Sequence, residues 1–212
     1  FPNEDMSAIP ALSSTYESNV PGMYVIGALG GYPLIKQAMN QGYEVVEYIQ
    51  GNDVRPADHG LLEDKFRALP YKMDVDEILE MAQERIPVFS GVNALQFREL
   101  MLDSSVQAPA ENAVIFAKND YTSTFFTVLE GEVKIEINED LTITSGMGSF
   151  FGEMSLISGR RRSATIRAGK NCVLIETPRR TMNKLIASVD AVKRVLDETF
   201  IVRTIQQKFA PN

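Results

Sequence analysis

The stretch from Phe150 to Thr165 brings together a glycine, a carboxylate and an arginine at a spacing that suits an anionic ligand. Gly152 lets the backbone come close to a ligand, and the residues after it can begin a helical turn whose free N–H groups attract an anion. Arg162 can bind two phosphate oxygens through parallel N–H bonds. Glu153 is unsuited to a phosphate but suits a sugar hydroxyl. The stretch therefore predicts a pocket for a phosphate attached to a sugar.

These residues resemble the phosphate-binding cassette of cyclic nucleotide-binding domains. The family pattern is Gly-Glu, two small or apolar residues, Leu, and then Arg followed by a small residue and Ala, and every member is present here. The resemblance implies that Glu153 accepts a hydrogen bond from the ribose 2′-OH and that Arg162 binds the exocyclic phosphate oxygens. It implies that one hydroxyl and three backbone N–H groups complete the cradle beside Gly152: the Ser163 hydroxyl and the N–H groups of Met154, Ser155 and Ala164.

The residue after the arginine bears on the choice of ligand. In the family a threonine there tends to favour guanine, whereas serine or alanine is usual in cAMP sites. Ser163 therefore favours cAMP and leaves cGMP open. We interpret Arg160 and Arg161 as solvent-facing, because three arginines in an acidic chain make a poor nucleic-acid surface.

Short β-type segments surround the cassette. Between 105 and 177, runs of apolar residues are separated by Gly, Asn and Asp, which is typical of a β-roll or jelly-roll barrel. The run 129–133, Leu-Glu-Gly-Glu-Val, is a second marker of the cyclic nucleotide-binding family. The predicted fold class is α+β: a jelly-roll-like β-roll flanked by helices, with an N-terminal βα segment. Helices are expected at about 61–69, 75–84, 93–101, 179–186 and 190–208, with Asp74 and Asp190 as N-caps.

The last of these helices has a broad apolar face. The family resemblance implies that it closes over the base as a lid and rearranges when ligand binds. Arg203, or its apolar neighbours Ile201 and Val202, would then meet the purine, and the sequence does not choose between them.

The N-terminal segment has a pattern of its own. Residues 22–27 are expected to form a buried strand, followed by a glycine-rich turn and a helix over 34–49, with Glu44 and Glu47 on its solvated face. This unit resembles the last βα element of the flavin domain in thioredoxin-reductase-like flavoproteins. The family has Asp after the strand glycine where this chain has Ala28, and neither Gly-x-Gly-x-x-Gly nor Cys-x-x-Cys is present, so FAD is not expected to bind.

We therefore predict three parts. Residues 1–55 are the tail of a flavoprotein-like, FAD/NAD-binding domain, 56–85 are a helical connector, and 86–209 are the cyclic nucleotide-binding domain. A chain that begins at Phe1 is expected to be a fragment or a processed product. A private βα embellishment is the alternative for the first part. If the tail interpretation holds, its apolar face needs a missing domain or a homodimer partner as cover.

Composition excludes several other functions. The net charge of −7 disfavours nucleic acid as a partner. Cys172 is the single cysteine, which suggests a reducing, cytoplasmic compartment, and His59 is the single histidine, so no metal or Ser-His-Asp site is expected. No run of about 20 apolar residues predicts a membrane span.

The function predicted from these observations is a regulatory module without catalytic residues. It would bind a cyclic nucleotide, with cAMP favoured, and transmit binding through the last helix to a fused or partner thioredoxin-reductase-like oxidoreductase. The parent protein would then be a flavin-dependent oxidoreductase. The alternative is a fragment of an FAD/NAD(P)-dependent oxidoreductase whose β-roll is structural or has an empty pocket.

Overall fold

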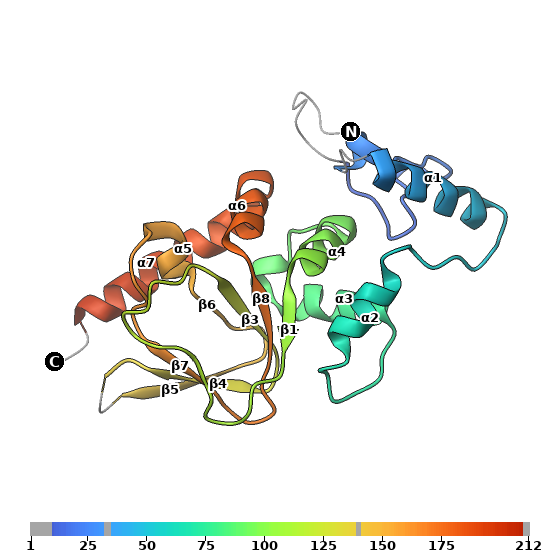
Figure 1. Cartoon of the computed structure of the whole chain (residues 1–212). Coiled ribbons are helices and arrows are strands. Elements are labelled where there is room, and N and C mark those ends of the chain that lie inside the picture. Colours follow the sequence, from blue (N-terminus) through green and yellow to red (C-terminus); the bar gives the residue numbers. More distant parts are fainter. Residues whose placement is uncertain (1–9, 32–34, 139–140, 210–212) are drawn as a thin grey trace.

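The computed structural model describes residues 10–31, 35–138 and 141–209. Two antiparallel four-stranded sheets pack together as a β-roll, and helices flank it (Figure 1). The strand orders are β1-β8-β3-β6 and β2-β7-β4-β5. The α+β prediction is therefore confirmed. The strands are β1 Ser105–Gln107, β2 Val114–Phe116, β3 Phe125–Glu130, β4 Glu132–Glu136, β5 Thr142–Gly146, β6 Phe150–Phe151, β7 Thr165–Ala168 and β8 Val173–Thr177.

The helices precede, interrupt and follow the strands. Two of them begin with capping boxes, in which Asp74 pairs with Glu77 and Asn93 with Gln96, so the predicted Asp74 cap is confirmed. Within the described ranges, no helix is both long and apolar enough to span a bilayer. The helices are α1 Ile35–Ile49, α2 His59–Phe66, α3 Val75–Arg85, α4 Ala94–Asp103, α5 Glu153–Ser158, α6 Arg179–Ser188 and α7 Asp190–Phe209, with 3₁₀ turns at Gly27–Gly30 and Pro87–Phe89.

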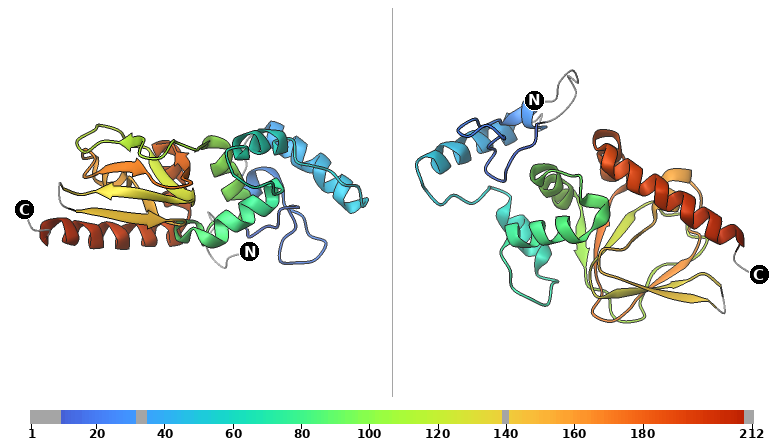
Figure 2. Two further views of the ribbon diagram at one scale, coloured as in Figure 1. Left: turned by 90° about the horizontal axis from the view of Figure 1, so that it is seen from below. Right: turned by 180° about the vertical axis from the view of Figure 1, so that it is seen from behind.

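Strand β3 shows why the core around the β-roll has two parts. Successive side chains of a strand point to opposite faces, and here both faces are buried. Phe125 and Leu129 pack with the helices, whereas Phe126 and Val128 pack between the two sheets. The two clusters fix the β-roll between α7 on one side and α3 and α4 at one end (Figure 2).

The predicted strand at residues 22–27 is wrong. Tyr24 makes one isolated bridge, to Glu17, and Gly27–Gly30 is a 3₁₀ turn. A strand is stable only when its backbone groups pair with a neighbour, and no described residue offers more than that bridge. The helix of the predicted βα unit does form, as α1.

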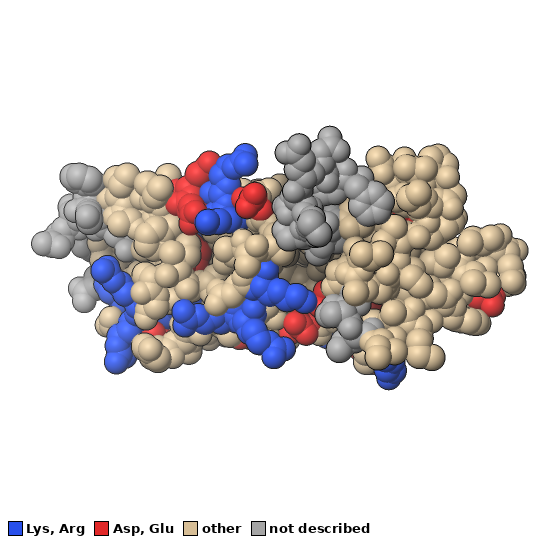
Figure 3. Space-filling model, turned by 90° about the horizontal axis from the view of Figure 1, so that it is seen from above, with Lys and Arg blue, Asp and Glu red and all other residues tan. Residues whose placement is uncertain are grey.

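Helix α1 also corrects the interpretation of Glu44. This side chain is 4% exposed and not solvated, because its carboxylate accepts hydrogen bonds from the Tyr16 hydroxyl at 2.5 Å and from the Ala57 N–H at 3.1 Å. Another side of α1 carries exposed apolar residues, and Figure 3 shows few charged side chains at this end of the molecule. The exposed apolar residues of α1 are Ile35, Met39, Tyr43, Val46 and Ile49.

Candidate functional site

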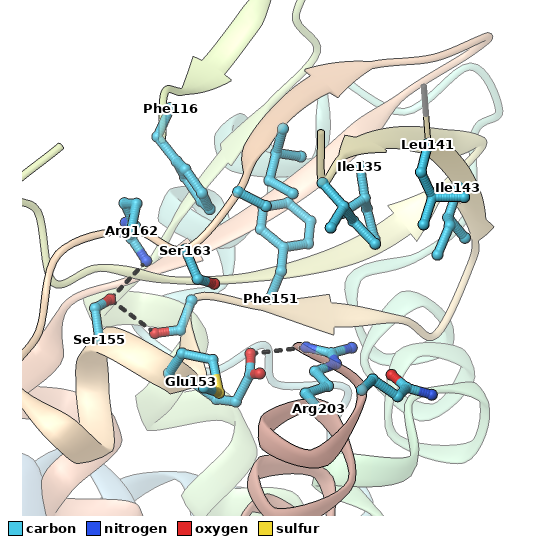
Figure 4. A pocket seen from close by; sticks show the side chains of 16 residues that line it. Phe116, Ile135, Leu141, Ile143, Phe151, Glu153, Ser155, Arg162, Ser163 and Arg203 are labelled. Carbon is cyan, nitrogen blue, oxygen red and sulfur yellow. Dashed lines mark hydrogen bonds and ion pairs between the residues drawn. The ribbon is translucent and has the colours of Figure 1, made fainter. Parts of the chain in front are cut away.

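A cavity of about 470 Å³ lies between the cassette, the β4–β5 hairpin and α7 (Figure 4). The cassette supplies its polar side, and apolar side chains of strands supply the opposite side (Figure 4). Every residue predicted for the binding site lines this cavity: Gly152, Glu153, Met154, Ser155, Arg162, Ser163, Ala164 and Arg203. The predicted residues come from two segments that are distant in sequence, and the fold brings them together around one cavity.

Gly152 is required by the close approach of its neighbours. Its φ of 96° is in the left-handed region, and a Cβ at this position would lie 2.6 Å from Nη1 of Arg162 and 2.7 Å from the carbonyl oxygen of Thr124. Helix α5 begins at the next residue. Glycine at this point lets the β6 strand turn sharply into α5 while the guanidinium lies against the backbone.

Arg162 is a buried cation held by neutral groups. Its side chain is 3% exposed, and burial lowers the pKa of Arg162 to about 10. In the part of the chain that the structure describes, no carboxylate oxygen lies within 4.0 Å of it. Nε donates to Thr122 Oγ1 at 2.8 Å, Nη1 to Ser155 Oγ at 2.9 Å and Nη2 to the Thr124 carbonyl oxygen at 2.8 Å. The Phe116 ring centre lies 4.0 Å from the guanidinium carbon.

Glu153 is the second buried charge and is 1% exposed. Nη1 of Arg203, from α7, lies 2.8 Å from Oε2 of Glu153. Neither carboxylate oxygen has a hydrogen-bond partner among the described residues, so this contact is an ion pair without hydrogen-bond alignment. Nη2 of Arg203 donates to the Phe150 carbonyl oxygen at 2.9 Å. Through this side chain α7 lies directly against the cassette (Figure 4).

The far wall of the cavity is apolar. Ile135 from β4 and Leu141 and Ile143 from the following hairpin face the cassette across the space in which Phe151 lies (Figure 4). Leu141 and Ile143 are 39% and 45% exposed, although they are large apolar residues. A flat apolar ligand group would bury them, so this wall suits a nucleobase while the cassette suits a charged sugar phosphate.

Other predicted residues lie outside the cavity. Ile201 and Val202, the alternative contacts to the base, are exposed and do not line it, which leaves Arg203 of the three. Arg160 and Arg161 are exposed, as predicted, and Nη1 of Arg161 donates to the Asn119 carbonyl oxygen. The basic residues of the cassette therefore divide into one inward and two outward side chains.

Several lining or supporting residues were missed by the sequence reasoning. Thr122 and Thr124 hold Arg162 from a loop with no motif of its own, and Gln206 lines the cavity from α7. Phe116 ends β2, and its stacking on the arginine depends on sheet pairing between β2 and β7, which the sequence pattern does not give. The one available signal was that 203 and 206 lie one turn apart on a helix.

His59 was expected to take part in no metal site, and the structure brings a small cluster together around it. One ring nitrogen of His59 and one oxygen each of Asp74 and Asp76 lie within 4.8 Å of one another. Asp76 is engaged by Arg98 at 2.8 Å, and Arg55 contacts His59 Nε2 at 3.1 Å. One carboxylate of the cluster is therefore already paired with an arginine, and one ring nitrogen of His59 is already in contact with another arginine.

Comparison with known proteins finds a matching family for most of the β-roll. Residues 108–189 match the family model of the cyclic nucleotide-binding domain. A cyclic nucleotide-gated potassium channel of Rhizobium etli is 32% identical over 90 residues, which are 42% of this chain and 25% of the channel. A second such channel, from Mesorhizobium japonicum, is 27% identical over 118 residues, which are 56% of this chain and 33% of the channel. The chain thus spans between a quarter and a third of the curated relatives that it matches.

Solved structures show the same fold at low identity. The sensor domain of the transcriptional regulator DNR from Pseudomonas aeruginosa has a TM-score of 0.52 and 16% identity, covering 63% of this chain and 97% of that one. The cAMP-bound PfPKA-R has a TM-score of 0.55 and 15% identity, covering 72% of this chain and 50% of that one. Residues 108–189 therefore match the cyclic nucleotide-binding domain in sequence, and the two-sheet architecture agrees with the β-roll fold of that family.

Proposed function

We propose that residues 86–209 bind a cyclic nucleotide in the cavity beside α5, with cAMP favoured over cGMP because Ser163 follows Arg162. Glu153 accepts from the ribose 2′-OH, and Arg162 binds the exocyclic phosphate oxygens. The remaining phosphate contacts come from the Ser163 hydroxyl and from the backbone N–H groups of Met154, Ser155 and Ala164.

The observation that carries this proposal is the buried charge of Arg162. A cation in a cavity wall, with hydroxyls and a carbonyl as its partners, has lost water and gained no opposite charge within 4.0 Å among the described residues. A cyclic phosphodiester brings one negative charge and two free oxygens. The phosphodiester therefore neutralises the guanidinium of Arg162 inside the cavity, where the pairing of opposite charges is more favourable than in water because both groups are buried.

We base the proposed signal transmission on the second buried charge, the carboxylate of Glu153, which is paired with Arg203 of α7. Nη1 of Arg203 lies 2.8 Å from Oε2 of Glu153, and a ribose hydroxyl bound to Glu153 would compete for the same carboxylate. Ligand binding thereby changes the contact that holds α7 on the cassette, and α7 acts as the lid. The ligand shifts α7 only as far as its affinities for the two positions of the helix differ.

We further propose that residues 1–55 are the tail of a flavoprotein-like domain and 56–85 a connector. The module would then regulate a fused or partner thioredoxin-reductase-like oxidoreductase in the cytoplasm, while this chain has no catalytic role. The support is the exposed apolar side of α1, which needs cover from a missing domain or a second copy. The buried free thiol of Cys172 is compatible with a reducing compartment.

Calorimetric titration of the chain with cAMP and with cGMP tests the binding proposal. We expect binding of one molecule per chain, with cAMP the tighter ligand and with loss of binding in Arg162→Ala. An absence of heat with both nucleotides, together with an unchanged melting temperature, would overturn the proposal in favour of an empty structural β-roll. Tighter binding of cGMP would overturn only the assignment from Ser163.

A further inference from the structure

We propose that Thr122 is a positioning residue that sets the direction of the Arg162 guanidinium, and this inference rests on the proposed binding of a cyclic phosphate. Thr122 lies in the loop between β2 and β3, far in sequence from the cassette and on the exposed surface. Its Oγ1 accepts from Nε of Arg162 at 2.8 Å. No family motif singles this residue out, so the structure alone assigns it.

The hydrogen bond from Nε of Arg162 to Thr122 restricts the orientation of the guanidinium plane. A guanidinium has five N–H donors, of which Nε carries one, and this N–H shares one edge of the plane with an N–H of one Nη group. Fixing Nε therefore fixes which edge of the planar group faces a ligand. The other short side-chain bond, from Nη1 to Ser155 Oγ at 2.9 Å, comes from the cassette itself, and Nη2 donates to the Thr124 backbone at 2.8 Å.

The loop that carries Thr122 is tied to the backbone of Arg162 on both sides. The Arg162 N–H donates to the Asp120 carbonyl oxygen at 3.0 Å, and the Asn119 N–H donates to the Arg162 carbonyl oxygen at 2.9 Å. The Asp120 carboxylate in turn accepts from the Ala117 N–H at 2.8 Å. These bonds hold the start of the arginine side chain, and Thr122 holds its far part, so the guanidinium is oriented before any ligand arrives.

An oriented guanidinium treats the two exocyclic oxygens of a cyclic phosphate differently. Replacing one or the other by sulfur gives the Sp and Rp phosphorothioates, and the weaker acceptor then lies toward or away from Arg162. Without the bond to Thr122 the guanidinium is held through its two Nη groups alone, to Ser155 and Thr124, and has more freedom to follow either oxygen. Loss of the Nε bond should therefore lower affinity and also bring the affinities for the two diastereomers closer together.

The test compares Thr122→Val, which keeps the shape and removes the acceptor, with Thr122→Ser, which keeps the acceptor. The control is Thr144→Val on β5, another exposed threonine outside the cavity lining. We expect Thr122→Val to bind cAMP about tenfold more weakly, with the Sp/Rp affinity ratio moved toward one. Thr122→Ser and Thr144→Val should keep both values near those of the parent. Thr122→Ala replaces the valine variant if the latter does not fold.

The outcomes separate this inference from the proposed function. If the parent binds cAMP and Thr122→Val leaves both the affinity and the Sp/Rp ratio unchanged, the positioning role is refuted and the binding site stands. A lower affinity with an unchanged ratio also refutes it, because general loosening of the loop weakens both diastereomers equally. A parent that binds neither cAMP nor cGMP overturns both proposals.

Discussion

Replacing Arg162 should abolish ligand binding while leaving the empty protein folded. Burial lowers the pKa of Arg162 to about 10, and against the ordinary arginine value of about 12.5 this corresponds to about 3 kcal/mol for holding the charge in the empty cavity. Arg162→Ala removes that cost together with hydrogen bonds to Thr122, Thr124 and Ser155 that stabilise by a similar amount. We expect the free energy of unfolding to change by less than about 2 kcal/mol.

The affinity for cAMP should fall much more than the stability when Arg162 is replaced. Removing one member of a desolvated charge pair costs about 2–5 kcal/mol, which is a loss of tens- to thousandsfold in affinity. Arg162→Lys keeps the charge without the planar fork and should bind at least about tenfold more weakly. Arg160→Ala and Arg161→Ala are the matched controls, since exposed charges contribute about 0–1 kcal/mol.

Calorimetric titration with cAMP in one buffer and salt, beside a thermal melt of each variant, measures both effects. Binding of cAMP by Arg162→Ala with the affinity of the parent would refute the role of this guanidinium in the site. Unfolding of that variant would refute the expected small change in the free energy of unfolding.

The remaining predictions use other features of the site. Since binding needs the charged guanidinium and the pKa of Arg162 in the empty protein is about 10, cAMP affinity should be constant near neutral pH and fall as the pH rises through about 10; a flat profile to about pH 10.5 would contradict this. Gly152→Ala should destabilise the protein by about 2–4 kcal/mol in denaturant unfolding, whereas Gly159→Ala, with a similar positive φ and no atom near its added Cβ, should cost only about 1 kcal/mol. Saturating cAMP should change amide hydrogen exchange in 195–208, and unchanged exchange would refute the lid. The purified chain should be colourless because Ala28 stands at the flavin position, and a stoichiometric flavin spectrum after gel filtration would show otherwise.

Much of the β-roll could be predicted because its sequence signals are local. Asp74 and Asn93 start helices through bonds within one turn, and Gly152 needs its special backbone whatever lies around it. The cassette is one short stretch, so its residues could be assigned before the sheet pairing was known. Arg203 was predicted only as one of three consecutive candidates, because the apolar face of this helix is broad and does not decide which of three side chains about 100° apart points into the cavity.

The errors arose where a distant neighbour decides the structure. Residues 22–27 have the composition of a strand, but a strand needs a pairing partner, and the described chain provides one bridge. Glu44 has the spacing of a solvated residue, but Tyr16 and Ala57 approach it from outside the helix. Thr122 could not be recognised because its partner, Arg162, lies on a segment that the fold alone brings near.

The two halves of α7 have different contacts: the first half packs in the main core and the second half contacts the cassette. This difference limits the motion that the helix can transmit. Val192 and Leu196 are within 1% of complete burial in the main core, whereas the distal half touches the cassette through Arg203 and exposes Ile201, Val202 and Ile205. Sliding the whole helix would open the core and cost several kcal/mol. If a ligand disturbs the contact at Glu153, we expect the distal half of α7 to swing about a pivot near Leu196, with a displacement that grows toward the C-terminal end of the helix. In the proposed mechanism, a domain that receives the signal would therefore be expected to contact that end, where the displacement of the helix is largest.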